Sequence, residues 1–179
     1  LERPDVIAAA PYVEGQGLVL ACEKLAGVRI RGIDPVLEQD VSTIAKLLQE
    51  GSLELMEAGS FRTLIGTSLA EELDVSVGDS LVLMLAEGRV TPAGLIPRMR
   101  RFEISGLFEV GMYEYDSTFV FVPLEAAQIF FRLRNGVTAI EVMLEDPEDL
   151  AVARQRVFEA ASQPVRIFDW QQANSHFFT

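Results

Sequence analysis

The most informative stretch of the sequence is Ser80-Leu-Val-Leu-Met-Leu-Ala-Glu-Gly-Arg-Val-Thr-Pro-Ala-Gly-Leu-Ile-Pro-Arg-Met-Arg-Arg-Phe-Glu-Ile-Ser-Gly-Leu-Phe108. Its two ends are apolar and predict a buried-looking strand over Ser80–Ala86 and a second strand over Phe102–Phe108. Between them, Arg89–Arg98 contains two prolines and a glycine, which predict a loop. The stretch therefore predicts a long β-hairpin over residues 80–108.

The tip of this hairpin has an unusual composition. Val90-Thr-Pro-Ala-Gly-Leu-Ile-Pro97 is a run of eight uncharged residues with an arginine on each side. Loop tips face water and are usually polar, and the two prolines stiffen this one, which reduces the entropy lost when a partner captures it. One interpretation is a rigid apolar plug for an apolar, acid-rimmed cavity in another protein. The alternative is a tip that folds back onto its own domain.

The chain before the hairpin begins with strand-like sequence. Val6–Val13 is apolar and β-compatible, Gly15-Gln-Gly17 predicts a bend or bulge, and Leu18–Cys22 continues extended. Two more segments have the pattern of short strands, Val28–Arg31 and Phe61–Ile65.

Two helices are predicted in the same half of the chain. Apolar residues at helical spacing predict a helix over Val36–Glu50. A second helix is predicted to run to Leu73, with Thr67 or Ser68 as its N-terminal cap.

The last third of the chain alternates between strands and helices. Strands are predicted at Thr118–Val122, Ala139–Leu144 and Pro164–Phe168, and helices at Leu124–Arg132 and Pro147–Ser162. The final strand–helix–strand is βαβ-like. Together with the strand-rich middle, it predicts the α+β fold class.

The charge balance argues against two classes of partner. Fifteen basic and twenty-seven acidic residues give a formal net charge of −12. Binding of nucleic acids or of anionic lipid headgroups rests on Lys and Arg, so neither is expected. The longest uncharged run, Trp170–Thr179, has ten residues, whereas a bilayer-spanning helix needs about 20. The charged start at Leu1–Asp5 lacks a signal-peptide pattern, so we expect a piece of a longer protein.

The sequence offers few groups for catalysis or metal binding. It has one histidine, His176, and one cysteine, Cys22, which argues against a zinc site and an internal disulfide. Acidic pairs such as Glu114 and Asp116 fall at expected turns or helix starts, where capping explains them. The sequence has neither a nucleophile elbow nor a phosphate-binding glycine loop. We therefore expect no enzyme activity and no cofactor or metal.

The tip and its return strand, Thr91-Pro-Ala-Gly-Leu-Ile-Pro-Arg-Met-Arg-Arg-Phe102, resemble the hook hairpin of the LolC/LolE family of lipoprotein-releasing ABC transporter subunits, and LolC in particular. Other stretches agree with that family in order along the chain: Gly27–Pro35, Ile65–Leu73, Val77–Asp79, Phe102–Asp116, Pro123–Gln128 and Asp169–Phe178. The resemblance implies a subunit of the bacterial inner membrane with this domain in the periplasm. It implies as partners the periplasmic lipoprotein carrier LolA, the ATPase subunit LolD, a second transmembrane subunit and lipoprotein cargo.

The resemblance also implies a domain organisation and a binding site. It assigns residues 1–14 and 137–179 to a porter-like βαβ subdomain, and residues 15–136 to a strand-rich inserted, sabre-like subdomain that carries the hook hairpin at 80–108. In that family the hook enters the lipid cavity of the carrier, and a polar pad contacts the rim. The hook residues are Val90, Thr91, Pro92, Ala93, Gly94, Leu95, Ile96 and Pro97, and the pad residues are Arg89, Arg98, Arg100 and Arg101.

Other hypotheses remain open at this point. Leu81 and Met99 stand where the family's pad has an arginine and a glutamine, so the hairpin arginines are expected to replace them. The chain can instead be a motion-relaying domain of a related MacB- or FtsX-type protein without carrier binding. A single subunit with the roles of both LolC and LolE is a further alternative. The rigid apolar tip favours carrier binding, because a purely mechanical domain does not need it.

Overall fold

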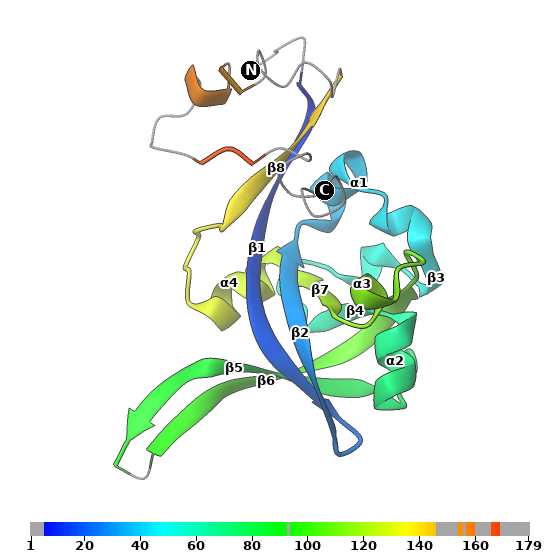
Figure 1. Ribbon diagram of the computed structural model, residues 1–179, viewed down its shortest axis with the longest axis vertical. Coiled ribbons are helices and arrows are strands. Elements are labelled where there is room, and N and C mark those ends of the chain that lie inside the picture. Colours follow the sequence, from blue (N-terminus) through cyan, green and yellow to red (C-terminus); the bar gives the residue numbers. More distant parts are fainter. Residues whose placement is uncertain (1–5, 93, 146–153, 156, 160–165, 169–179) are drawn as a thin grey trace, which may run out of the picture. The chain divides into compact units, whose positions relative to one another are not determined.

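The computed structural model describes residues 6–92, 94–145, 154–155, 157–159 and 166–168, and the side chains of all of these except residues 86–91 and 95. The chain divides into two compact units, one of Ala9–Glu141 and one of Leu1–Ala8 with Val142–Thr179. Most of the regular structure belongs to the larger unit (Figure 1). No helix in the part of the chain that the structure describes is long and apolar enough to cross a membrane.

The order of elements is that of a strand-rich α+β domain. The strands are β1 (Val6–Ala21), β2 (Lys24–Ile33), β3 (Leu48–Gly51), β4 (Arg62–Gly66), β5 (Ser80–Thr91), β6 (Gly94–Phe108), β7 (Phe119–Pro123) and β8 (Ala139–Leu144). The helices are α1 (Pro35–Val41), α2 (Thr67–Leu73), α3 (Tyr113–Asp116) and α4 (Leu124–Phe131), with short 3-10 turns at Ile44–Leu47 and Leu53–Leu55.

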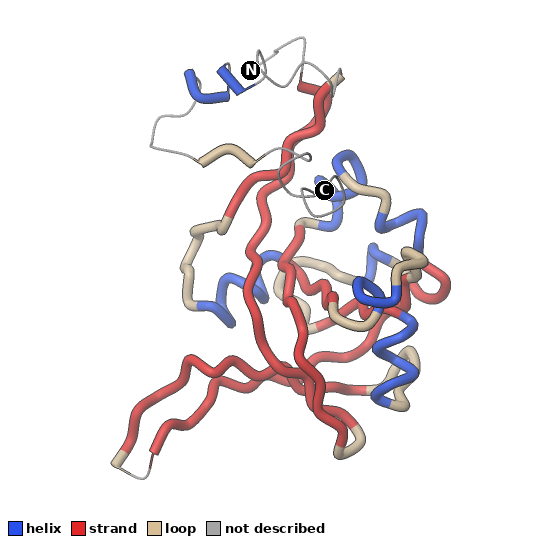
Figure 2. Tube along the Cα trace, in the orientation of Figure 1, coloured by secondary structure: helices blue, strands red, loops and turns tan. Residues whose placement is uncertain are grey.

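Six of the strands close into a ring. Its hydrogen-bonded neighbours are β1–β2, β2–β7, β7–β4, β4–β6, β6–β5 and β5–β1. The β2–β7 and β4–β6 pairs are parallel and the other four are antiparallel. β3 adds to β6 and β8 adds to β1 outside this ring (Figure 2). Closure leaves few unpaired strand edges, which protects the unit from edge-to-edge association.

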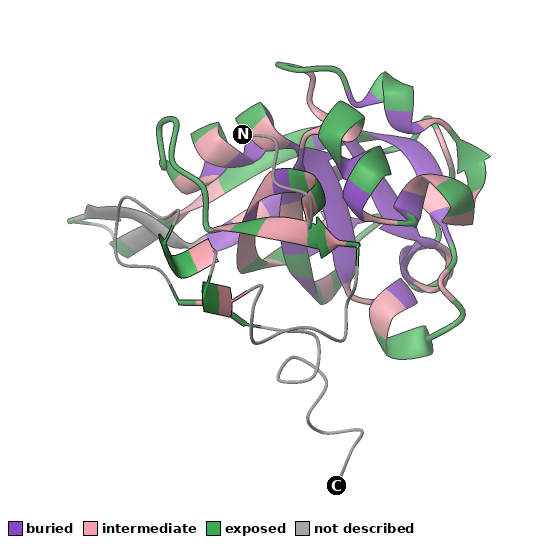
Figure 3. Ribbon diagram, turned by 90° about the horizontal axis from the view of Figure 1, so that it is seen from above, coloured by how far each residue is buried: buried purple, intermediate pink, exposed green. Residues whose placement is uncertain are grey.

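Two hydrophobic clusters lie on opposite sides of β4 and β7. Alternate side chains point to opposite faces of a strand, so Ile65 and Val120 join the first cluster, while Leu64 and Phe121 join the second. Figure 3 shows the buried colour concentrated on strands in the interior of the fold. Burial of each such side chain stabilises the fold by about 1.5–3 kcal/mol relative to exposure.

The bend predicted at Gly15–Gly17 is wrong, because β1 runs without interruption from Val6 to Ala21. Both glycines instead allow close packing. A Cβ at Gly15 would lie 2.3 Å from the ring of Phe131, and one at Gly17 would lie 2.8 Å from Ile30 Cδ1. The glycines therefore mark places where neighbouring elements approach the strand.

The helix predicted over Val36–Glu50 is wrong beyond Val41, where α1 ends. Tertiary pairing overrides the helical spacing there, because β3 hydrogen-bonds to β6. The Ser42 hydroxyl also accepts a hydrogen bond from the Ile44 amide at 3.3 Å, which stabilises the break.

The predicted cap of α2 is also wrong, although the helix itself is confirmed. α2 starts at Thr67, its N-cap residue is Gly66, and no side chain that the structure describes caps it. A Cβ at Gly66 would lie 2.0 Å from the Asp116 carbonyl oxygen. Close packing against the α3 turn therefore occupies the space that a capping side chain at position 66 would need.

The described part of the C-terminal region contains helix and irregular chain. Of the helix predicted at Pro147–Ser162, the structure describes residues 154–155 and 157–159, and these are helical. Its other positions lie outside the described residues. Arg166–Phe168 has no regular structure, so the predicted strand over Pro164–Phe168 is wrong in its described part. Within this described part Phe168 is 74% exposed, so its side chain is not buried against a sheet as the alternating pattern suggests. The strand at Ala139–Leu144 is confirmed.

Candidate functional site

The β5–β6 hairpin is longer and more regular than the sequence predicts. Its register runs from Ser80 opposite Glu103 to Thr91 opposite Gly94, which leaves a two-residue connection. Gly94 has φ +120°, a conformation that glycine adopts without strain. The loop predicted over Arg89–Arg98 is therefore wrong, because both strands continue to the turn.

A bulge interrupts the middle of the hairpin. Leu85 pairs with Arg98 and Gly88 with Pro97, so β5 has two extra residues at this step. Proline has no N–H to donate to a ladder and is tolerated at bulges, which bend a strand and re-aim its far end. The outer part of the hairpin projects away from the other elements of the larger unit (Figure 1).

The described part of the tip faces solvent. Pro92 and Gly94 are exposed, Ile96 is 57% exposed, and Pro97 is half-buried. These residues therefore do not pack back onto the unit. The other predicted hook positions lie outside what the structure describes, Ala93 entirely and Val90, Thr91 and Leu95 in their side chains.

Arg98 ties the hairpin to a helix. Its guanidinium Nη1 donates a hydrogen bond to the carbonyl oxygen of Phe130 in the last turn of α4. The last carbonyls of a helix lack partners within the helix, and a cation near that end is favoured by the helix dipole. Arg98 is half-buried, so this contact fixes the hairpin rather than leaving the arginine in solvent.

The other predicted pad arginines lie in different surroundings. The Arg100 guanidinium lies over the ring of Phe61, 4.4 Å from its centroid. Arg101 is exposed and, as the next residue of the strand, points to the face of β6 opposite to that of Arg100. The side chain of Arg89 is outside the described set. The structure therefore separates Arg101, which is free to meet a partner's surface, from two arginines with contacts inside the unit.

An aromatic cluster anchors the inner end of the hairpin. Phe102 is 1% exposed. Its ring lies edge-on to Phe61 and Phe130, with centroid distances of 5.7 and 6.3 Å. Offset and edge-to-face aromatic pairs stabilise a core beyond their buried area. The exposed tip is thus built on a firmly packed base.

Arg98→Ala is expected to lower the free energy of unfolding by about 1–3 kcal/mol, because it leaves the buried Phe130 carbonyl without its charged donor. Urea unfolding of the purified chain measures the change. Arg101→Ala, on the exposed face of the same strand, is the matched control and should stay within about 0.5 kcal/mol. Equal losses for both variants would contradict the proposed tie to α4.

An apolar face that the sequence did not predict lies beside the hairpin base. Leu18 pairs with Met84, and Met84 pairs with Met99, so these side chains lie in one row across β1, β5 and β6. Leu18 is 40% exposed and Met99 is 49% exposed. The available signal was the unbroken apolar run Leu81–Leu85, in which only alternate residues can point to the core. We call these three residues the outer apolar row.

Metal ligands and acidic pairs are the remaining candidate features of the sequence. Within the described residues, no three or more His, Cys, Asp and Glu side chains are grouped to hold a metal ion. Asp116 of the predicted acidic pair is buried and accepts hydrogen bonds from the amides of Val110 and Gly111, at 2.8 and 3.0 Å. Its role is to hold a turn, as the sequence predicts.

These features define a class of protein. A profile described as the MacB-like periplasmic core domain matches residues 1–159, and the chain belongs to this family. Its fold is similar to the periplasmic region of MacB from Actinobacillus actinomycetemcomitans, with TM-score 0.57 and 13% identity over 89% of this chain and 67% of that one. It is equally similar to the extracellular domain of the ABC-type transporter YknZ from Gram-positive bacteria, with TM-score 0.57 and 16% identity over 82% and 70%. At these identities the likeness shows the fold alone.

The particular relatives are lipoprotein-releasing system transmembrane proteins LolC. The chain is 33% identical to LolC of Neisseria meningitidis over 98% of its length, and 36% identical to LolC of Xylella fastidiosa over 98%. A LolE protein of Haemophilus influenzae is 26% identical over 82%. The chain spans 43%, 42% and 35% of these relatives. The resemblance to the LolC/LolE family, with LolC foremost, is confirmed.

Proposed function

We propose that this chain is the periplasmic domain of an inner-membrane subunit of a lipoprotein-releasing ABC transporter, and that its β5–β6 hairpin recruits the carrier LolA. The observation that carries the proposal is an exposed apolar tip on an anchored base. Ile96 is 57% exposed at the outer end, while Phe102 is 1% exposed at the inner end. A preorganised apolar element is suited to insertion into a lipid-binding cavity, because it loses little conformational entropy on binding.

The base of the hairpin is proposed to meet the rim of the carrier. Arg101 and the outer apolar row lie on one face of the sheet. Arg101 pairs with Val82, which is two residues before Met84 on β5. Residues two positions apart on a strand point to the same face. A solvated arginine at a rim adds association rate and specificity more than affinity. The exposed methionine Met99 supplies an adaptable apolar contact.

The rest of the larger unit is proposed to relay motion. A closed ring of strands with two packed clusters is stiff, since protein interiors are close-packed and resist compression. We propose that the motion originates in other parts of the complex. The proposed partners of the whole protein are the ATPase subunit LolD, a second transmembrane subunit and lipoprotein cargo. The relatives' designation as transmembrane proteins and their greater length support this assignment.

A mechanical domain without carrier binding is the second candidate. The fold shared with the periplasmic region of MacB favours it. The two candidates differ in one measurable property, namely whether the isolated chain binds LolA.

Titration of purified LolA into the 179-residue chain by calorimetry tests the proposal. Saturable binding is expected, and it should weaken as salt is raised if Arg101 contributes at the rim. A folded chain that gives no binding heat and does not co-elute with LolA would favour the mechanical candidate.

A further inference from the structure

A cavity of about 220 Å³ with charged, polar and apolar residues in its lining lies in the larger unit. Its lining comes from β2, α1, the following 3-10 turn, α3, β7 and β8, and no described lining residue belongs to the β5–β6 hairpin. Arg31, Glu38, Tyr115 and Glu141 are among the residues that line it. The cavity therefore cannot be explained by the proposed carrier-binding function.

Glu38 is the unusual residue of this cavity. It is only 2% exposed, and its Oε2 atom has no hydrogen-bond partner among the described residues. Asp34 caps α1 by accepting hydrogen bonds from the amides of Val36 and Leu37, at 2.9 and 3.3 Å, which places Glu38 one turn into the helix. A buried carboxylate oxygen without a hydrogen-bond partner costs free energy. A ligand that donates a hydrogen bond to this oxygen would remove that cost.

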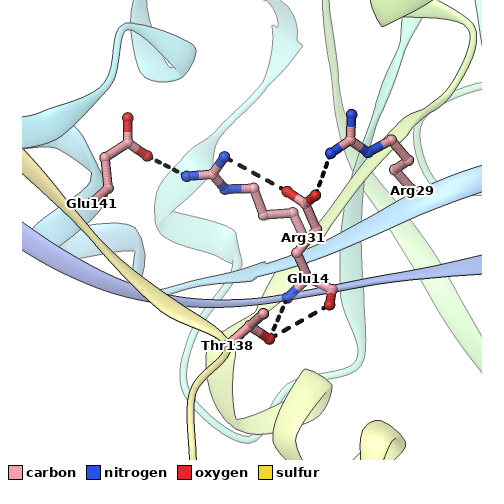
Figure 4. A network of polar contacts seen from close by, with 5 residues as sticks. All are labelled: Glu14, Arg29, Arg31, Thr138 and Glu141. Atoms are coloured by element: carbon pink, nitrogen blue, oxygen red, sulfur yellow. Dashed lines mark hydrogen bonds and ion pairs between the residues drawn. The ribbon is translucent and has the colours of Figure 1, made fainter. Parts of the chain in front are cut away.

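A network of ion pairs adjoins Glu38. Arg31 forms an ion pair with Glu141, and its Nη1 lies 3.9 Å from Oε2 of Glu14. Arg29 forms an ion pair with the Glu14 carboxylate as well (Figure 4). The Glu14 amide donates to the Thr138 hydroxyl at 3.0 Å, which fixes the backbone of the network.

The charges of this cluster do not balance. Its guanidinium groups are Arg29 and Arg31, and its carboxylates are Glu14, Glu38 and Glu141. Two positive and three negative charges leave one carboxylate in excess. Glu14 and Glu141 each have an arginine partner, so Glu38 is the carboxylate of this cluster without an ion-pair partner among the described residues.

Burial raises the pKa of Glu38, against the opposing effects of Arg31 and of a hydrogen bond from the Ser42 side chain. Glu38 is therefore protonated more readily than an exposed glutamate, and the proton neutralises its charge. A bound cation would take the place of that proton.

Exposed apolar residues adjoin the cavity-lining ones in the chain. Val36, two positions before Glu38, is 72% exposed, while Met112 and Tyr113, just before Tyr115, are 53% and 72% exposed. Met and Tyr are enriched in protein–protein interfaces, whose strongest contacts are central and surrounded by weaker ones. This setting favours a protein side chain as the occupant over a free ion.

We propose that this cavity is a docking site for a lysine or arginine side chain of a partner protein, whose cationic group pairs with the Glu38 carboxylate. The buried unpartnered oxygen supplies the acceptor, and the excess negative charge supplies the complementarity. The Nε–H of Arg31, which has no hydrogen-bond partner in the described part of the chain, is left for a bridging water. This site is separate from the hairpin, so it stands or falls independently of LolA binding.

The first test is a pair of stability measurements on Glu38→Gln. A raised carboxyl pKa contributes stability that is present below the ordinary value of 4.5 and is lost as pH rises through the raised value. Glu38→Gln should therefore melt at a higher temperature than the unsubstituted chain at neutral pH, and this gain should vanish in acid. Glu72→Gln, on the exposed face of α2, should shift neither melt. A lower melting temperature for Glu38→Gln at neutral pH would show that Glu38 already has a sufficient partner, and would overturn the proposal.

The second test uses n-butylammonium and methylguanidinium chloride as probes of the cavity. Backbone amide NMR of the 179-residue chain should show saturable shifts around Glu38, Ser42 and Tyr115 that sodium chloride at equal ionic strength does not reproduce. Glu38→Gln should weaken this binding by more than about tenfold, whereas Glu72→Gln should leave it unchanged. Shifts that spread over the acidic surface, or that persist in Glu38→Gln, would identify general screening and overturn the proposal.

A pH series on the unsubstituted chain gives an independent readout. The charged and titratable groups around Glu38 are Arg31 on β2, Glu141 on β8, Glu14 and Tyr12 on β1, and Tyr115 on α3. Probe binding should tighten as pH rises through the raised pKa of Glu38, because the cation and the proton compete for one carboxylate. Binding that does not change across this range would contradict the pairing with Glu38.

Discussion

Replacing Leu95 and Ile96 together by aspartate is expected to weaken LolA binding by more than about 100-fold. Ile96 is 57% exposed in the free chain, and Leu95 pairs with Val90 one step from the turn. If both side chains enter the carrier's lipid cavity, each loses about 1.5–3 kcal/mol of burial on substitution, and each new carboxylate must also be desolvated. Calorimetric titration with purified LolA measures the loss.

The matched control for this variant is Ile129→Asp. Ile129 is 55% exposed on α4, so it changes the same kind of side chain at nearly the same exposure outside the hairpin. It should leave LolA binding unchanged. The melting temperature of the double variant should also hardly change, because an exposed tip contributes little to the core. Normal binding by a folded double variant would refute the hook assignment, and a double variant that unfolds would show that the tip belongs to the core.

The sequence predicts most strands of this fold because their apolar patterns are local. Ala139–Leu144 and Val28–Arg31 lie within strands of the structure. The errors occur where a distant segment decides the conformation. Gly15 and Gly17 read as a bend because the close approach of Phe131 and Ile30 cannot be seen in the sequence.

The same limit explains what the sequence could not predict at the two sites. The tip stands out by composition alone, because eight uncharged residues between arginines are unusual in a loop. The contact of Arg98 with Phe130 joins residues 32 positions apart, and that of Arg31 with Glu141 joins residues 110 positions apart. Glu38 lies in a sequence that predicts an ordinary amphipathic helix. Its burial depends on elements that only the fold brings together.

Phe102→Ala is expected to lower the free energy of unfolding by about 3–5 kcal/mol, the range for removal of a fully buried phenylalanine ring. The ring is 1% exposed and packs edge-on against Phe61 and Phe130, so truncation leaves a cavity where β6, α4 and the segment before β4 meet. Small domains are stable by about 5–15 kcal/mol, so the loss is a large fraction of the total. Urea unfolding should show a lower midpoint with an unchanged slope.

Met99→Ala is the matched control for this prediction, because it shortens an apolar side chain on the same strand but on the opposite, solvent-facing side. Met99 is 49% exposed, and its truncation should change stability by no more than about 0.5 kcal/mol. It should instead reduce LolA binding, since Met99 belongs to the outer apolar row proposed to meet the carrier. The two variants thus separate the anchor of the hairpin from its contact surface. Equal stability losses for Phe102→Ala and Met99→Ala would mean that the aromatic cluster is not the anchor, and the rigid base on which the hook proposal depends would be lost.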